Sequence, residues 1–415
     1  MNATARTRAR WAVPGAVALA VAAAVAVPTL ASADAGDLPE TTPTDLLADV
    51  AAAEPFALSG TAVYTARLGL PELTAEMTGG ADPLNLLSGS STIRVWTDGA
   101  ERSRVALLGS ASEYSVVMDG PQMWTYSSAD NAVTHLSLDT ESLAMSEEFA
   151  AQEAMPTGEV PTPTEFAEHL LAVAEENAQV TLGEDVRVAG RDAYQLLLTP
   201  TTPGTLLQEV SIAVDGETYL PLSVQVWSTQ EPGAPALELA FTDLTYETPS
   251  DAALAFSAPA GAAVTEHALS ADDLREQSMH QGEAPTLPGD LTNEATEGAT
   301  LPEGVSVSGE GWAEIVRVED VDLTALLSGD PEQVQAELAD SPFADGRNGD
   351  LMEEFKGEGD GFGVDGNALF DQLTTPVEGG RLFSSTLLSA LITDDGVLYV
   401  GSVPTQALLA EAGLA

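Results

Sequence analysis

The chain has 415 residues, of which 44% are hydrophobic and only 5% aromatic, so a packed core must be built mainly from Ala, Val and Leu. It carries 14 Lys and Arg against 65 Asp and Glu, a formal net charge of -51 at pH 7. This charge argues against nucleic acid and anionic lipid surfaces as partners, because both require a basic face. Cys is absent, which excludes disulfides, thiolate metal sites, a Cys nucleophile and lipidation of a cysteine.

The first segment has the pattern of an export signal. Arg6, Arg8 and Arg10 form a positively charged start, an apolar stretch follows over 16–27, and Ala31-Ser32-Ala33 supplies the small-x-small pattern of a cleavage site. We expect a Sec-type signal peptide over 1–33, cleaved after Ala33, and a soluble product in the cell envelope or outside the cell. The alternative is an uncleaved anchor, but the apolar run is shorter than the roughly 20 residues that a membrane span needs.

A short helix and then a long series of strands are predicted for residues 42–265. The helix begins near Thr42, because Pro43 suits the first helical position. From 56 to 256, apolar and polar residues mostly alternate, which is typical of strands with one buried face. Turn signals such as Asp98-Gly99, Asp119-Gly120 and Asp215-Gly216 separate these strands. The pattern predicts an antiparallel meander of about nine or ten strands.

One clear helix interrupts the predicted strands. It begins at Thr162-Pro163-Thr164-Glu165 and places Phe166, His169 and Leu170 on one apolar side. We interpret His169 as a core or rim residue rather than as a ligand. The helix would lie over the apolar face of the sheet.

The last third of the chain predicts a linker followed by a second module. Residues 266–302 are polar and rich in Gly, Pro, Thr and Glu, without a sustained period, as in a linker. Residues 303–415 predict a small C-terminal α/β module. It has a strand over 312–318, a hairpin turn at Asp394-Asp395-Gly396 and a final helix over 404–412.

The motifs of common enzymes are absent from the sequence. The four His form no pair with metal-ligand spacing, and there is no nucleophile elbow, phosphate-binding loop or dinucleotide fingerprint. The sequence therefore predicts no catalytic residue, no cofactor and no metal. Residues 345–350 leave two interpretations open, a solvated acidic loop or a weak Ca²⁺ site, although they lack the acid spacing of an EF-hand.

The apolar face of the predicted sheet points to a binding function. Such a face must be covered by a second sheet, by helices or by a ligand. Because the two predicted helices are short, we expect an incompletely filled cavity that suits an acyl chain or another apolar ligand. A closed sandwich filled by its own side chains, as in a structural or adhesive envelope protein, is equally compatible with the periodicity. The predicted lining residues are Leu58, Ala62, Tyr64, Leu68, Tyr114, Val116, Met118, Phe166, Leu170, Tyr194, Leu196, Leu198, Ile212, Val224, Val226, Leu239 and Phe241.

The order of several short segments resembles a known family. The segments are Leu58-Ser59-Gly60-Thr61-Ala62, Arg94-Val95-Trp96, Met118-Asp119-Gly120, 188–196, Ile212-Ala213-Val214-Asp215, Leu220-Pro221-Leu222, 239–244 and 256–261. In this order they resemble the LolA-like superfamily of exported carriers, in particular its actinobacterial branch, over Thr42 to Val264. The resemblance implies a mainly β (α+β) fold, an unclosed antiparallel β-barrel with a helical lid, and a lipid or acylated lipoprotein as ligand.

The resemblance also implies a residue role and a second function. An arginine on an early strand helps to close the lid in LolA, which makes Arg94 or Arg104 the lid-closing candidate, with a surface arginine as the alternative. The added C-terminal module is similar in architecture to RseB-like regulators, which bind an anti-sigma factor. Two functions therefore stand side by side. One is an exported lipid or lipoprotein carrier, and the other is an envelope-stress regulator that binds the external domain of a membrane protein. The sequence does not indicate an oligomeric state.

Overall fold

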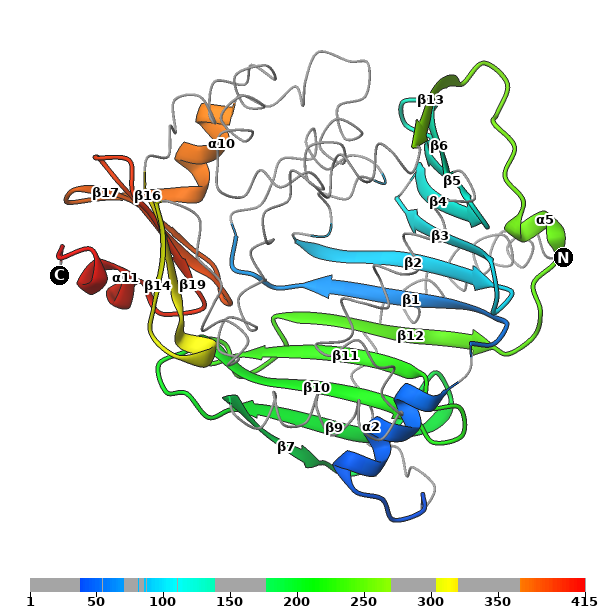
Figure 1. Cartoon of the computed structure of the whole chain (residues 1–415), viewed down its shortest axis with the longest axis horizontal. Coiled ribbons are helices and arrows are strands. Elements are labelled where there is room, and N and C mark those ends of the chain that lie inside the picture. The colour runs from blue at the N-terminus through cyan, green and yellow to red at the C-terminus, as the bar shows by residue number, and fades with distance from the viewer. Residues whose placement is uncertain are drawn as a thin grey trace, which may run out of the picture.

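The computed structural model describes residues 38–53, 55–70, 81, 86, 88–109, 111–138, 177–269, 304–319 and 366–414. These residues form a 13-stranded sheet and a 6-stranded sheet (Figure 1). The predicted signal peptide, the predicted helix beginning at Thr162 and the Gly/Asp segment at 345–350 lie outside the described residues. Within the described part of the chain, no helix is long and apolar enough to cross a membrane.

The larger sheet contains most of the predicted strands. Its strands are β1 (Leu58–Ala66), β2 (Gly89–Thr97), β3 (Arg102–Leu108), β4 (Glu113–Asp119), β5 (Gln122–Ser127), β6 (Ala132–Leu138), β7 (Ala178–Leu182), β8 (Val186–Val188), β9 (Arg191–Pro200), β10 (Leu207–Asp215), β11 (Pro221–Ser228), β12 (Leu237–Thr245) and β13 (Ala263–Leu269). Their order is β13-β6-β5-β4-β3-β2-β1-β12-β11-β10-β9-β7, and β8 pairs with β9. The order ends in two different edge strands, so the described sheet is not closed into a barrel. This agrees with the predicted mainly β, unclosed fold.

Two pairings depart from a simple meander. β1 pairs with β12, which joins the first strand of this sheet to one of its last. β13 pairs with β6 in parallel and continues to Leu269, although the sequence predicts a linker from Glu266 onward. Alternation within a strand says which side chains share a face, but it does not say which distant strand will be the neighbour.

The predicted tight turns lie where the sequence places them, and the turn between β2 and β3 shows why. Asp98 accepts hydrogen bonds from the backbone amides of Ala100 and Arg102, at 2.9 and 3.1 Å. The Arg102 Nε atom also donates to Asp98, at 2.8 Å. Gly99 has a φ of +76°, and an added Cβ would lie 2.5 Å from the carbonyl carbon of Phe56. Only glycine fits this position without displacing the backbone.

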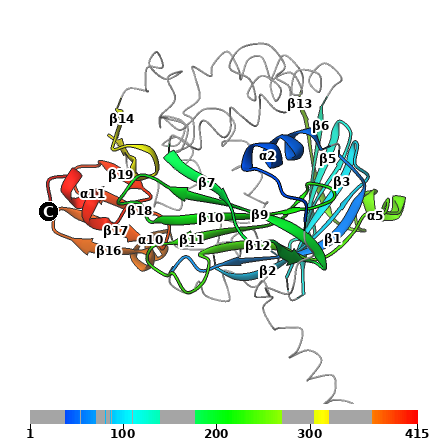
Figure 2. The same cartoon turned by 90° about the horizontal axis from the view of Figure 1, so that it is seen from below.

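The larger sheet is strongly curved, and helix α2 (Pro43–Ala52) lies on its concave side (Figure 2). The helix begins as predicted, since the Thr42 hydroxyl accepts a hydrogen bond from the Asp45 amide at 3.1 Å. Its Leu46 is fully buried in a cluster with Tyr194, Leu196 and Val214. This cluster forms the core under one end of the concave side.

A different segment covers the convex side. Helix α5 (Asp251–Leu254) packs on β2, β3 and β4, and its Leu254 is fully buried. Phe256 follows and stacks on Trp124 of β5, with the ring centroids 5.7 Å apart. The chain leaving β12 therefore supplies hydrophobic cover to the outer face of the β3–β5 region.

The smaller sheet is antiparallel throughout. Its strands are β14 (Val305–Ser308), β15 (Ile315–Val318), β16 (Thr374–Val377), β17 (Gly380–Ser384), β18 (Ser389–Thr393) and β19 (Leu398–Gly401), in the order β14-β15-β19-β18-β17-β16. The predicted hairpin joins β18 to β19, and the predicted last helix is α11 (Thr405–Glu411). Helix α10 (Gly366–Leu373) precedes β16. The strand predicted over 312–318 is shorter, because Gly311–Ala313 forms a 3₁₀ turn, η3.

Buried hydrogen bonds join the two sheets at a seam. The amide of Leu206 donates to the Ser402 carbonyl at 2.7 Å, and the Thr205 hydroxyl donates to the same oxygen at 3.0 Å. The Thr386 amide donates to the Leu68 carbonyl at 2.9 Å, while the Ser228 hydroxyl donates to the Thr386 carbonyl. Polar groups that are paired across a boundary fix the relative position of the two surfaces.

Candidate ligand-binding face

The strand register gathers most of the predicted lining residues on one face. Residues opposite each other in an antiparallel ladder point to the same side of the sheet. One such row crosses five strands and consists of Leu196, Ile212, Val224, Leu239 and Tyr64. Because Tyr194 and Leu196 pack against α2, this row lies on the α2 side, which we call the concave face.

The same face continues across the other half of the sheet. Successive rows on β1 to β4 are Ala62 with Ile93, Leu107 and Tyr114; Gly60 with Val95, Val105 and Val116; and Leu58 with Thr97, Ser103 and Met118. These rows follow Tyr64 at two-residue steps along β1, so their side chains lie on the same side as Tyr64. Thus the alternation in the sequence produces one broad surface made of aliphatic, aromatic and hydroxyl side chains.

The described residues cover this face only in part. At the α2 end, Leu46 closes over the sheet and leaves Tyr194 and Leu196 buried. Farther along, Leu239 is 41% exposed, Val105 42% and Met118 46%. Large apolar side chains that several neighbouring strands leave accessible on one face are typical of a binding surface.

Some predicted lining residues lie elsewhere. Phe241 is opposite Ala62 in the register, but its side chain packs with a cluster that contains Ala193, Ala213 and Leu222 rather than with α2. Leu68 follows the end of β1, at the seam with the smaller sheet. Phe166 and Leu170 lie outside the described residues, so their place in a lid stays a prediction.

The two lid-closing candidates lie on the convex face. Arg94 is opposite Ala106, and Arg104 is opposite Val117, both at positions that alternate with the concave-face residues of the same strands. The guanidinium carbons of Arg94 and Arg104 lie 4.9 and 5.8 Å from the centre of the Trp96 ring. Arg104 also pairs with Glu113 at 2.6 Å. This placement does not support the lid-closing role that the resemblance implies, because both side chains point away from the concave face.

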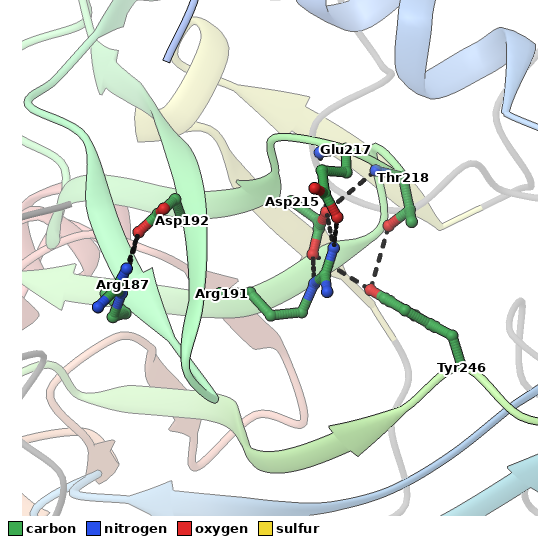
Figure 3. A network of polar contacts seen from close by, with 7 residues as sticks. All are labelled: Arg187, Arg191, Asp192, Asp215, Glu217, Thr218 and Tyr246. Carbon is green, nitrogen blue, oxygen red and sulfur yellow. Dashed lines mark hydrogen bonds and ion pairs between the residues drawn. The ribbon is translucent and has the colours of Figure 1, made fainter. Parts of the chain in front are cut away.

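A polar network near the ends of β9, β10 and β12 is built around a buried carboxylate (Figure 3). Asp215 is fully buried and pairs with Arg191, whose Nη2 lies 2.9 Å from Oδ1. The amides of Glu217 and Thr218 also donate to Oδ1, at 2.9 and 3.0 Å, and the Tyr246 hydroxyl donates to Oδ2 at 3.2 Å. Both carboxylate oxygens thus have more than one donor, which is typical of a structural ion pair. We call this Arg191–Asp215 pair, with the groups that donate to it, the clasp.

The pKa of Asp215 reflects this arrangement. Burial by itself raises the pKa, but the hydrogen bonds from Arg191 and from the two backbone amides outweigh burial. The pKa of Asp215 therefore lies below its ordinary value. The sequence contains turn signals at Gly190-Arg191-Asp192 and at Asp215-Gly216, but it does not indicate that these turns meet. The only sign of the Arg191–Asp215 pair is an Asp at the end of an apolar strand.

A separate cavity lies at the seam between the sheets. It has a volume of about 200 Å³ and is lined by Leu207, Val226, Gly311, Trp312, Glu314, Leu387 and Ser402. The sequence gives no signal for it, because its walls come from β10, β11, η3 and two loops of the smaller sheet. Over the described ranges, no group of three or more His, Asp or Glu side chains is arranged to hold a metal ion.

The fold and this surface define a class of protein: a mainly β chain whose open, curved sheet presents an apolar concave face. No family model matches the sequence, and no curated protein matches it. Among solved structures, the chain is similar to MucB (18% identity, TM-score 0.35, covering 90% of this chain and 95% of that one). It is also similar to MucB in the Pseudomonas aeruginosa MucA/MucB complex (16% identity, TM-score 0.37, covering 88% and 94%).

A third similar structure is a LolA superfamily protein from Nitrosomonas europaea. It shares 13% identity at a TM-score of 0.20, and the match covers 52% of this chain and 99% of that one. This third structure is thus a member of the superfamily that the sequence resembles, while the place of this chain in that superfamily and in its actinobacterial branch stays a prediction. We take no residue role or ligand from these structures.

Proposed function

We propose that this protein is an exported carrier of lipid or acylated lipoprotein, which holds acyl chains against the concave face of the larger sheet. The observation that carries the proposal is the difference between the two faces. On the convex side, Leu254 and Phe256 cover the β3–β5 region. On the concave side of the same region, Val105 and Met118 remain 42% and 46% exposed.

The chemistry of the concave face suits a hydrocarbon chain. The rows across β1 to β4 and β9 to β12 present Val, Leu, Ile, Met and Tyr side chains, with hydroxyl groups at a few positions and no charged residue among the positions named above. Each methylene transferred from water contributes roughly 0.8 kcal/mol, so a chain of about ten contributes about 8 kcal/mol before the cost of immobilising it. Such binding needs no charged contact, which is consistent with a strongly acidic protein.

The proposal is tested on the purified full-length mature protein. Native mass spectrometry, together with organic extraction, should find bound acyl species, and delipidated protein should take up a fluorescent fatty acid. Protein that is repeatedly free of lipid and takes up no fatty acid would reject the carrier function and would leave an exported β-rich scaffold.

A second candidate function is an envelope-stress regulator that binds the external domain of a membrane protein. The observation that favours it is the hydrogen-bonded seam, through which occupancy of the larger sheet could reach a partner bound to the smaller one. The loop before β18 of the smaller sheet also exposes Leu388, at 40%. If this function holds, Leu388→Asp should abolish capture of the external domain of a membrane-bound anti-sigma factor from the same genome. If the wild type and Leu388→Asp capture this domain equally, or if neither captures it, the result counts against the regulator function.

A further inference from the structure

The seam cavity combines apolar walls with two polar side chains. Leu207, Val226 and Leu387 supply aliphatic surface, and Trp312 and Glu314 come from η3 and the residue that follows it. At about 200 Å³ the cavity is larger than the cavity of about 150 Å³ that is known to hold a benzene molecule. It can therefore hold one substituted ring.

The turn that carries these two side chains is held tightly against the larger sheet. Gly311 has a φ of +53°, and an added Cβ would lie 2.4 Å from Asn177 Oδ1 and 2.7 Å from Thr202 Oγ1. Any other residue here would have to displace the Asn177 and Thr202 side chains and to adopt a backbone conformation that L-residues rarely take. Glycine thus lets the turn bring Trp312 and Glu314 up to the cavity.

Two enclosed polar atoms at this cavity have no hydrogen-bond partner among the described residues. They are Nε1 of Trp312 and Oε2 of Glu314, and the Glu314 residue is only 7% exposed. Leaving a buried donor or acceptor unpaired costs about 1–3 kcal/mol each. Burial raises the pKa of Glu314, although a hydrogen bond from the Gly311 backbone partly opposes this effect. The two residues that carry these orphaned atoms line a space that is large enough for a ligand.

The two atoms make different demands on a ligand. The indole Nε1–H can only donate, so the ligand must offer an acceptor, and an ionised Glu314 can only accept, so the ligand must also offer a donor. An ammonium group would pair with an ionised Glu314 but offers no acceptor to the indole N–H, and a carboxylate has no donor and would face Glu314 with a like charge. A hydroxyl has one donor and two lone pairs, and it brings no charge into the cavity.

We propose that the seam cavity binds a small neutral ligand whose apolar body carries a hydroxyl group. The apolar body lies against Leu207, Val226 and Leu387, while the hydroxyl accepts from Trp312 Nε1 and donates to Glu314 Oε2. Val226 lies two residues from Val224 on the same side of β11, so the cavity borders the concave face used in the proposed carrier function. Its two polar side chains come from η3 and the residue that follows, and the proposal does not depend on the carrier function being correct.

The test compares four ligands of nearly equal size on the full-length mature protein: benzyl alcohol, toluene, benzylamine and benzoate. Affinities are measured by titration calorimetry or by ligand-observed NMR. Benzyl alcohol should bind about five- to tenfold more tightly than toluene, the ratio expected for about one net neutral hydrogen bond. Benzylamine and benzoate should bind more weakly than benzyl alcohol.

Variants assign the preference to the two side chains. Trp312→Phe and Glu314→Met keep most of the packing volume, and each should reduce the preference for benzyl alcohol over toluene to about twofold or less. Thermal unfolding reports whether each variant is folded, and Val264→Asp on the edge strand β13 is the control that should leave benzyl alcohol binding unchanged. Equal binding of toluene and benzyl alcohol, tighter binding of benzylamine, no binding of any ligand, or a preference that survives in both variants would overturn the proposal.

Discussion

Val117 and Met118 are neighbours in β4, yet Val117 is fully buried and Met118 is 46% exposed. Consecutive side chains in a strand point to opposite faces, so this pair compares the two sides of the sheet at one place. Val117 points to the side covered by α5, and Met118 points to the concave face. The contrast shows that this part of the sheet has a closed side and an accessible side.

The carrier proposal predicts a difference between two matched valines. Val105 lies on the concave face of β3 and is 42% exposed, whereas Val264 lies on the edge strand β13 and is 48% exposed. Val105→Asp should lower the affinity for a fluorescent fatty acid about tenfold or more, because a carboxylate then faces the hydrocarbon chain. Val264→Asp, the same change at similar exposure, should leave the affinity within about twofold. Equal losses in both variants would contradict a binding site on the concave face.

Helix α5, which covers the convex side, is predicted to contribute to stability through Leu254. Leu254 is fully buried against β2–β4, so Leu254→Ala should lower the free energy of unfolding by about 2–5 kcal/mol. Leu239→Ala, at an exposed position, should change it by about 1 kcal/mol or less. Urea denaturation followed by circular dichroism measures both. A small loss for Leu254→Ala would mean that α5 contributes little to the core.

The buried clasp predicts a large loss of stability when the charge of Asp215 is removed. Asp215→Asn leaves Arg191 without its main partner and should lower the free energy of unfolding by about 3–5 kcal/mol. The control is Glu217→Gln, because Glu217 also pairs with Arg191 but is 81% exposed in its side chain. It should cost about 1 kcal/mol or less. Equal effects of the two substitutions would show that burial of the clasp does not matter.

The clasp also predicts a pH dependence. The pKa of Asp215 is lower in the folded protein than in the unfolded chain, so its contribution is present above the ordinary Asp pKa of about 3.9. It is lost as the pH falls through the lowered pKa of the folded state. The stability difference between the wild type and Asp215→Asn should therefore be constant from about pH 5 to 7 and should shrink below about pH 4. A difference that grows on acidification would contradict this assignment.

For Glu314 we expect a pH dependence of stability that is opposite in sign to that of Asp215. Burial raises its folded-state pKa, so the folded protein is favoured most while the carboxyl is protonated, and this contribution declines as the pH rises through the raised pKa. Glu314→Gln should therefore stabilise the protein relative to the wild type at pH 7, and this advantage should shrink toward pH 4. Thermal unfolding at the two pH values measures it. Glu310→Gln, at a nearby exposed position, is the matched control.

The sequence could predict what depends on local order. Alternation in segments such as 113–119 and 207–215 gives the strands, and Asp-Gly pairs give several of the turns. Helix α2 follows from Thr42 and Pro43. The same alternation separates Arg94 from Val95, so the convex position of Arg94 was within reach of the sequence, whereas the family resemblance pointed to the other face.

What the sequence could not predict depends on long-range pairing. Nothing local shows that β1 lies beside β12, or that residues 266–269 continue a strand parallel to β6. The Asp215–Arg191 clasp and the seam cavity arise only after distant elements have been brought together. A polar residue at a strand end has the same local pattern whether it faces water or a buried partner.

The position of β1 in the sheet has a consequence for how the chain matures. One edge of β1 is satisfied by β2, which follows soon after it, but the other edge pairs with β12, with Tyr64 opposite Leu239. During synthesis, that second edge stays open until nearly all strands of the larger sheet have emerged. Such late closure slows folding and leaves a row of unpaired backbone groups open to other chains. Newly synthesised molecules should therefore depend on a holding chaperone more than the stability of the finished protein would indicate.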